Sequence, residues 1–145
     1  MHDMLAVIRM RGSVRTSKGT EDTLKMLRLH RKMHCVLLTK NDSYRGMLQL
    51  TKDFITWGEI SDIMLEKLVL KRGRKAGNNR LTSEEIISVI TALQSGAPLS
   101  KLPIKPVFRL SPPSGGFKHG IKHAYPKGEL GNRKEKINEL LEKMI

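Results

Sequence analysis

The sequence has little cysteine, few aromatic residues and no long apolar run, and each shortage excludes a class of protein. A single cysteine, Cys35, rules out an internal disulfide and the zinc sites that need several cysteines from one chain. Aromatic residues make up 4% of the chain, too few for a platform that stacks single-stranded nucleic acid. The longest apolar stretch, residues 86–93, is far below the ~20 residues of a membrane span. Because residues 4–8 are also too short for a signal peptide, we expect a soluble, cytoplasmic protein.

Acidic residues are also scarce relative to basic ones. Lysine plus arginine total 27 and aspartate plus glutamate 14, which gives a formal net charge of +13 over 145 residues. A chain of this length suits one domain, or one core plus an appendage, and such an excess favours a polyanionic partner. Residues 4–20, 67–83 and 86–128 contain no acidic residue. Cations in loops repel each other unless phosphates lie nearby, although a merely solvated surface stays open for any one segment.

Apolar periodicity predicts a mixture of strands and helices. Strands are expected over residues 5–10, 35–39, 55–58 and 107–110. Helices are expected after Thr20, over 44–54 after a Ser43 cap, over 61–70, after the Thr82–Glu85 capping box, and after Asn132. Strand, helix and strand over residues 5–39 suit a crossover, which is right-handed if the two strands are parallel. Gly46 within a helix costs about 1 kcal/mol relative to alanine, so we expect a close neighbour there.

The predicted fold is α+β, a ferredoxin-like small sheet with helices packed mainly on one face. A basic, glycine-rich C-terminal extension follows and ends in a helix whose apolar stripe is Ile137, Leu140, Leu141 and Met144. Trp57 is expected to be partly in the core, and the helix after Thr20 is expected to turn Leu24, Leu27 and Met26 inward.

Two basic segments contain glycine, residues 71–75 and 116–123. Glycine lets backbone approach a sugar–phosphate chain where a side chain would collide. The sequence lacks helix-turn-helix, zinc-finger and basic-zipper patterns, whereas structured RNA is recognised by shape and backbone. We therefore predict RNA binding and expect the second segment to order on RNA, with a flexible tail as the alternative.

Other patterns have simpler explanations than catalysis or metal binding. His119 and His123 are four residues apart but lack a second pair of ligands, so phosphate or base contact is the better interpretation. Histidines 30 and 34 flank a helix end, where capping explains them, and Cys35 suits a buried core position. Residues 12–15 are similar to the anion cradle of a small acyl-phosphate hydrolase, but no positioned amide or pocket accompanies them. We predict no enzyme activity, no cofactor and no metal site.

Five stretches resemble one universal ribosomal family: residues 5–12, 21–30, 34–38, 43–47 and 55–59. It is called large-subunit protein thirty in bacteria and large-subunit protein seven in eukaryotes. Residues 115–119 and 128–133 are similar to the C-terminal region of its long archaeal form. The Tyr44–Met47 and Trp57-Gly58 motifs carry the most specific part of the resemblance.

The resemblance implies a structural constituent of the large ribosomal subunit that binds and clamps folded ribosomal RNA. Residues 1–60 would be the bacterial-type core, two helices on three antiparallel strands; residues 61–110 a helical elaboration with the last strand; and residues 111–145 the basic extension and terminal helix. Implied partners are large-subunit ribosomal RNA, the small ribosomal RNA of that subunit and neighbouring ribosomal proteins, with no membrane and no small-molecule substrate. The implied location is the cytoplasmic ribosome.

Charge and resemblance together predict the RNA contacts. They are Arg9, Arg11, Arg15, Lys18, Arg45, Lys71, Arg72, Arg74, Lys75, Arg80, Lys118, His119, Lys122, His123, Lys127 and Arg133.

Three rival functions make distinct demands. An RNA-recognition motif needs an aromatic-bearing strand that the sequence lacks, a hydrolase needs acyl-phosphatase activity, and a non-specific nucleoid protein needs equal affinity for duplex DNA.

Overall fold

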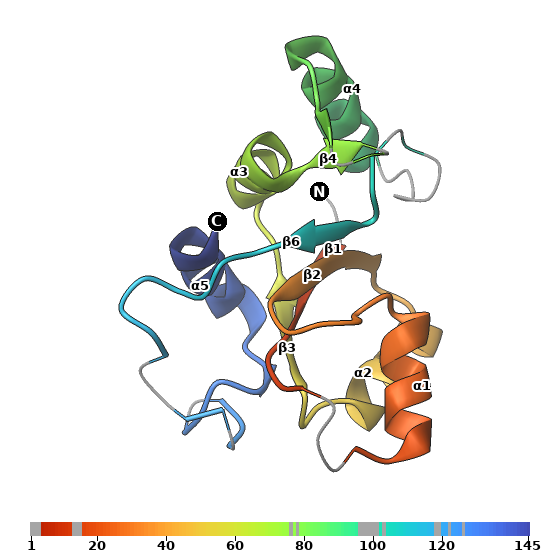
Figure 1. Cartoon of the computed structure of the whole chain (residues 1–145), viewed down its shortest axis with the longest axis vertical. Coiled ribbons are helices and arrows are strands. Elements are labelled where there is room, and N and C mark those ends of the chain that lie inside the picture. The colour runs from red at the N-terminus through yellow and green to blue at the C-terminus, as the bar shows by residue number, and fades with distance from the viewer. Residues whose placement is uncertain are drawn as a thin grey trace.

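The computed structural model describes residues 4–12, 16–75, 77, 79–95, 102, 104–117, 120–121, 123–125 and 127–145. The elements are β1 (Met4–Arg9), α1 (Lys18–Met26), β2 (His34–Thr39), α2 (Asp42–Leu50), β3 (Ile55–Glu59), α3 (Asp62–Arg72), β4 (Arg74–Lys75), β5 (Asn79–Arg80), α4 (Ser83–Gln94), β6 (Val107–Arg109), β7 (Gly131–Asn132), the 3-10 helix η3 (Lys134–Lys136) and α5 (Ile137–Met144). The predicted α+β class, with a small ferredoxin-like sheet and a C-terminal helix, is confirmed (Figure 1).

The main sheet has the strand order β6-β2-β1-β3-β7. β1 pairs antiparallel with β2 and with β3, β2 pairs antiparallel with β6, and β3 pairs parallel with β7. Because β1 and β2 are antiparallel neighbours, α1 is not a parallel crossover. β4 and β5 form a separate two-stranded sheet that the sequence pattern did not predict.

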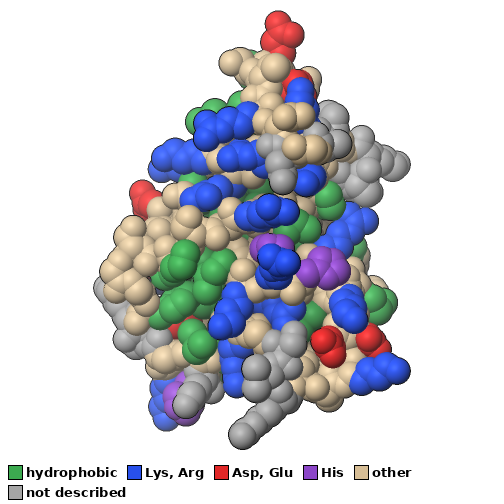
Figure 2. All heavy atoms as spheres, viewed as in Figure 1, with side chains coloured by type: hydrophobic (Ala, Val, Ile, Leu, Met, Phe, Trp, Pro, Cys, Tyr) green, Lys and Arg blue, Asp and Glu red, His purple; other side chains and the backbone are tan. Residues whose placement is uncertain are grey.

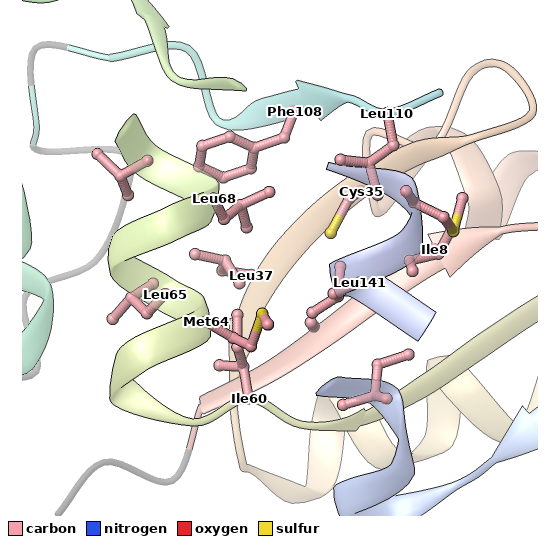
Figure 3. Packing of buried hydrophobic residues seen from close by; sticks show 14 of the residues in the cluster. Ile8, Cys35, Leu37, Ile60, Met64, Leu65, Leu68, Phe108, Leu110 and Leu141 are labelled. Carbon is pink, nitrogen blue, oxygen red and sulfur yellow. The ribbon is translucent and has the colours of Figure 1, made fainter. Parts of the chain in front are cut away.

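Helices lie on both faces of the sheet, where the sequence analysis placed them mainly on one. The strand alternation explains this, because successive residues of β2 point to opposite faces. Val36 and Leu38 join one core with residues of α1 and α2, and Cys35 and Leu37 join a larger core with residues of α3, α4 and α5. In Figure 3, Leu68, Phe108 and Leu141 gather over Cys35 and Leu37. Residues 35–38 are apolar at every position, as a strand covered on both faces requires.

The starts of α1 and α2 are set by caps other than those predicted. Ser17 caps α1, its hydroxyl accepting from the backbone N–H of Thr20 at 3.3 Å, so the helix begins earlier than a Thr20 cap would allow. Asn41 rather than Ser43 caps α2, accepting from the N–H of Tyr44 at 2.8 Å. Cap-forming side chains lie close together before both helices, so local sequence does not choose among them.

The start of α4 follows the sequence, and that of the terminal helix does not. Thr82 caps α4 as predicted and accepts from the N–H of Glu85 at 3.3 Å. The predicted Asn132 cap of the terminal helix is wrong: Asn132 accepts from the N–H of Lys134 at 2.9 Å, but Arg133 precedes η3 and Lys136 precedes α5, and neither position has a side-chain cap. The predicted stripe of α5 is confirmed, since all of its members are buried.

Two glycines and two apolar residues test the finer packing predictions. A Cβ on Gly58 would collide with the carbonyl oxygen of Lys134, so this glycine permits η3 and α5 to lie against β3. The close neighbour expected at Gly46 is not found among the described residues, because a Cβ there would have none of their atoms within 4 Å. Trp57 is buried in the smaller core, whereas Met26 is 71% exposed instead of facing inward.

Candidate nucleic-acid interface

The hairpin of β4 and β5 concentrates cations at the end of α3. Gly73 is needed for the turn into this hairpin, because a Cβ there would lie 2.5 Å from the carbonyl oxygen of Val69. The ladder then places Arg74 directly opposite Arg80. Like charges directly opposite each other destabilise a strand pair, so the hairpin gains from an anion beside it.

The neighbouring cations of the hairpin are partly held by the protein. Arg72 donates to the hydroxyl of Ser111 at 2.8 Å, which ties the end of α3 to the residues after β6. Lys75 lies 3.3 Å from a carboxylate oxygen of Glu85. The pKa of Glu85 is lowered by the hydroxyl of Thr82 and then by Lys75, so this acid neutralises one charge of the hairpin.

A second group of cations lies where β2 pairs with β6. The ladder makes His34 and Arg109 cross-strand partners, and the backbone N–H of His34 donates to the carbonyl of Arg31 at 3.4 Å. Arg31 and Arg109 are exposed, and His34 is half-buried. The backbone N–H of Lys105 donates to the carbonyl of Arg74 at 2.7 Å, which joins the segment leading into β6 to the hairpin.

These two groups form what we call the basic face: Arg31, His34, Lys71, Arg72, Arg74, Lys75, Arg80 and Arg109. Figure 2 shows lysine and arginine side chains running from the β4 region across β6 and β2, with histidines near the middle. Acidic side chains in this view lie toward its margins. The arrangement is a strip of positive potential without a catalytic constellation, and it suits a polyanion.

Sequence reasoning missed part of this face. It assigned histidines 30 and 34 to helix capping, but α1 ends at Met26 with Leu27 as its C-cap, so both lie beyond the helix. It included Arg109 in an acid-free segment but did not predict it as an RNA contact. The run of cationic residues from His30 to His34 was a visible signal, but its proximity to Arg109 depends on strand pairing that local sequence does not encode.

Two of the predicted contacts, Arg9 and Arg133, are buried, with exposed fractions of 3% and 6%. Arg9 donates to the carbonyl of Leu29 at 2.7 Å, and its pKa is lowered by burial and raised in part by Glu21. Its inward direction follows from strand alternation, because Arg9 shares a face of β1 with buried Val7. This guanidinium has little surface left for a ligand.

Arg133 lies in the interior between the C-terminal segment and β3. Its guanidinium forms an ion pair with Glu129 and donates to the hydroxyl of Thr56 at 2.9 Å. It also donates to the backbone carbonyl of Glu129 at 2.7 Å and lies 5.3 Å from the ring centroid of Tyr125. Arg133 therefore fastens the C-terminal segment to the sheet.

The other predicted contacts that the structure describes are dispersed over the surface. Lys18, His123 and Lys127 are exposed on α1 and on the C-terminal segment, and Arg11 is half-buried with its guanidinium 5.3 Å from the Phe54 ring centroid. Arg45 is exposed on α2 and lines a pocket of about 410 Å³ that also contains acidic residues. Arg15, Lys118, His119 and Lys122 lie outside the described residues.

Metal, thiol and membrane features give no competing site within the described ranges. The described residues contain no group of three or more side chains that could ligate a metal, and His119 lies outside the described residues. Burial raises the pKa of the Cys35 thiol to about 12, so at neutral pH it is a protonated core side chain. None of the described helices has the length and apolar character needed to traverse a bilayer.

Comparison with known proteins identifies similar chains. A family model described as ribosomal protein L30p/L7e matches residues 5–55. The chain is 48% identical to large ribosomal subunit protein uL30 of Methanococcus vannielii, over 97% of this chain and 98% of that protein. It is 47% identical to the uL30 protein of Archaeoglobus fulgidus, over 97% and 99% of the two chains. With the uL30 protein of Staphylothermus marinus it shares 43% identity over the whole of both chains.

Proposed function

This chain belongs to the ribosomal protein L30p/L7e family, and we propose that it binds and clamps folded ribosomal RNA through its basic face. It is a structural protein of the large ribosomal subunit and not an enzyme. The observation that carries the RNA-binding proposal is that the β4–β5 hairpin places Arg74 directly opposite Arg80. A second group of cationic residues, which includes the cross-strand partners His34 and Arg109, belongs to the same basic face. Phosphates of a folded RNA supply the negative charge that this face lacks.

The proposed contacts are the exposed and half-exposed cations of the sequence prediction together with the residues it missed. Arg31, His34 and Arg109 join Arg11, Lys18, Arg45, Lys71, Arg72, Arg74, Lys75, Arg80, His123 and Lys127, and the proposal also retains Arg15, Lys118, His119 and Lys122. We assign Arg9 and Arg133 to the scaffold. The same proposal divides the chain at about residues 60 and 110. It also names the small ribosomal RNA of the subunit and adjacent ribosomal proteins as partners.

A salt-dependence experiment tests the proposal. The variant Arg74→Gln, Arg80→Gln, Arg109→Gln removes three cations from the basic face. The matched control, Lys67→Gln, Lys136→Gln, Lys143→Gln, removes the same charge from α3, η3 and α5, where Lys67 and Lys136 already have carboxylate partners. Dissociation constants are measured for a large-subunit ribosomal RNA transcript at several salt concentrations, with duplex DNA as competitor.

The wild-type protein and the control are expected to prefer the transcript over duplex DNA. The basic-face variant is expected to lose affinity and to show a salt slope smaller by about one per phosphate contact removed. An equal loss in both variants, or equal wild-type affinity for duplex DNA, would contradict the proposal.

A further inference from the structure

A row of cationic side chains crosses three adjacent strands on the face of the sheet that α1 covers. His34 and Arg109 are cross-strand partners on β2 and β6. The ladder between β1 and β2 ends with Ile8 opposite Cys35, so Arg9 follows beside His34, and the backbone N–H of Met33 donates to the carbonyl of Arg9 at 2.8 Å. His34 therefore lies between two arginines on the same face.

Within the described part of the chain, the charged groups that act on His34 are all cationic. Burial is the main factor that lowers the pKa of its imidazole, and Arg109, Arg31, His30 and Arg9 lower it further. They come from β6, from the connection between α1 and β2, and from β1. Glu21 of α1 acts on Arg9.

Hydrogen bonding also fails to favour a charged ring. The Nδ1 atom of His34 is buried and has no hydrogen-bond partner within the described structure. A buried polar atom without a partner calls for an explanation. Among the residues that the structure describes, none accepts a proton from Nδ1, while the arginines beside the ring remain charged at any physiological pH.

We infer that Arg31, His34 and Arg109 form a site for an RNA phosphate group, and that His34 takes up a proton when the phosphate binds. The inference rests on the proposed function and deepens it, because it assigns one phosphate to named residues. Arg31 and Arg109 supply exposed guanidinium donors, which suit phosphate oxygens. The phosphate supplies the negative charge that the site lacks, so the imidazolium becomes favourable only in the complex.

The direction of the pH effect follows from this linkage. In the RNA-free protein His34 is neutral at pH 7, because its pKa lies below the ordinary value. Since RNA raises that pKa, binding takes up a proton and affinity rises as the pH falls. The gain is about tenfold for each pKa unit that RNA adds, and it levels off below the pKa of the free protein.

The test follows the His34 ring itself. The imidazole C–H resonances of isotopically labelled protein are titrated from pH 8 to pH 5, alone and with a hairpin transcribed from large-subunit ribosomal RNA. In wild type the pKa of His34 is expected to rise on adding the hairpin. Arg109→Gln is expected to raise the pKa of His34 in the RNA-free protein and to reduce the RNA-induced rise. Lys25→Gln removes an exposed α1 cation that does not act on His34, and is expected to change neither.

Dissociation constants for the same hairpin at pH 8, 7 and 6 provide the second readout. Wild type and Lys25→Gln are expected to bind more tightly toward pH 6, and His34→Gln is expected to lose most of that gain. If wild type binds the hairpin but the pKa of His34 does not move, or if His34→Gln keeps the full pH dependence, the phosphate site is overturned while RNA binding stands. If wild type does not prefer ribosomal RNA at all, the proposed function fails and this inference fails with it.

Discussion

The buried ion pair of Arg133 and Glu129 gives the sharpest prediction about stability. Their side chains are 6% and 7% exposed, and the guanidinium also bonds the Thr56 hydroxyl and the Glu129 carbonyl. The variant Arg133→Met keeps much of the side-chain volume but removes the charge that compensates Glu129. Breaking a buried ion pair from one side costs about 3–5 kcal/mol, a large part of the 5–15 kcal/mol of a typical domain.

The same reasoning predicts that removing both charges costs much less than removing one. In the double variant Arg133→Met, Glu129→Met no buried carboxylate is left behind, and replacing an ion pair by apolar groups is often nearly neutral. The free energies of unfolding of wild type, both single variants and the double variant are measured by urea denaturation followed by circular dichroism. They form a double-mutant cycle.

Two results would refute this account of Arg133. A loss below about 1 kcal/mol in Arg133→Met would mean that the pair is not desolvated as its burial implies. Losses that simply add in the double variant would mean that the two side chains do not act on each other. The folded fraction of Arg133→Met should also retain the wild-type salt slope for RNA, because Arg133 is assigned to the scaffold.

Three further predictions concern the fold and its titratable groups. Gly58→Ala is expected to destabilise the protein by about 1–3 kcal/mol, because its Cβ collides with the Lys134 carbonyl. Gly46→Ala, whose Cβ meets no described atom, is expected to stabilise α2 by up to about 1 kcal/mol. Equal urea midpoints for the two variants would disprove the packing at β3. The RNA-free protein is expected to lose stability as the pH falls below about 6.5, because His34 binds a proton more readily in the unfolded state than in the folded state. If the stability of His34→Gln depends on pH as strongly as that of wild type, His34 is not the cause. Cys35 is expected not to react with a thiol reagent at pH 8 until the protein unfolds, and rapid labelling of the native protein would contradict its burial.

Features with local signals were predicted well from sequence. The unbroken apolar run of residues 35–38 predicted a strand that is buried on both faces, and the Thr82–Glu85 capping box predicted the start of α4. Both signals depend on residues a few positions apart. The confirmed α5 stripe has the same origin.

Features that depend on distant pairing were missed for an identifiable physical reason. β7 consists of Gly131 and Asn132, which have low strand propensity and become a strand only by pairing with β3. The β4–β5 hairpin is built from arginine, lysine and asparagine, so it carries no apolar alternation. The proximity of His34 to Arg109 joins residues far apart in the chain. Charge counting found the cations but not which of them are buried, as Arg133 illustrates.

The most direct measurement of the central claim is sedimentation of cell lysates that contain tagged wild type, the basic-face triple variant or its matched control. Wild type and control are expected to migrate with large ribosomal subunits and to remain there through a moderate-salt wash, while the basic-face variant is expected to be depleted. Equal retention of all three proteins, or wild type at the top of the gradient, would contradict the claim that these cations hold the protein on folded ribosomal RNA.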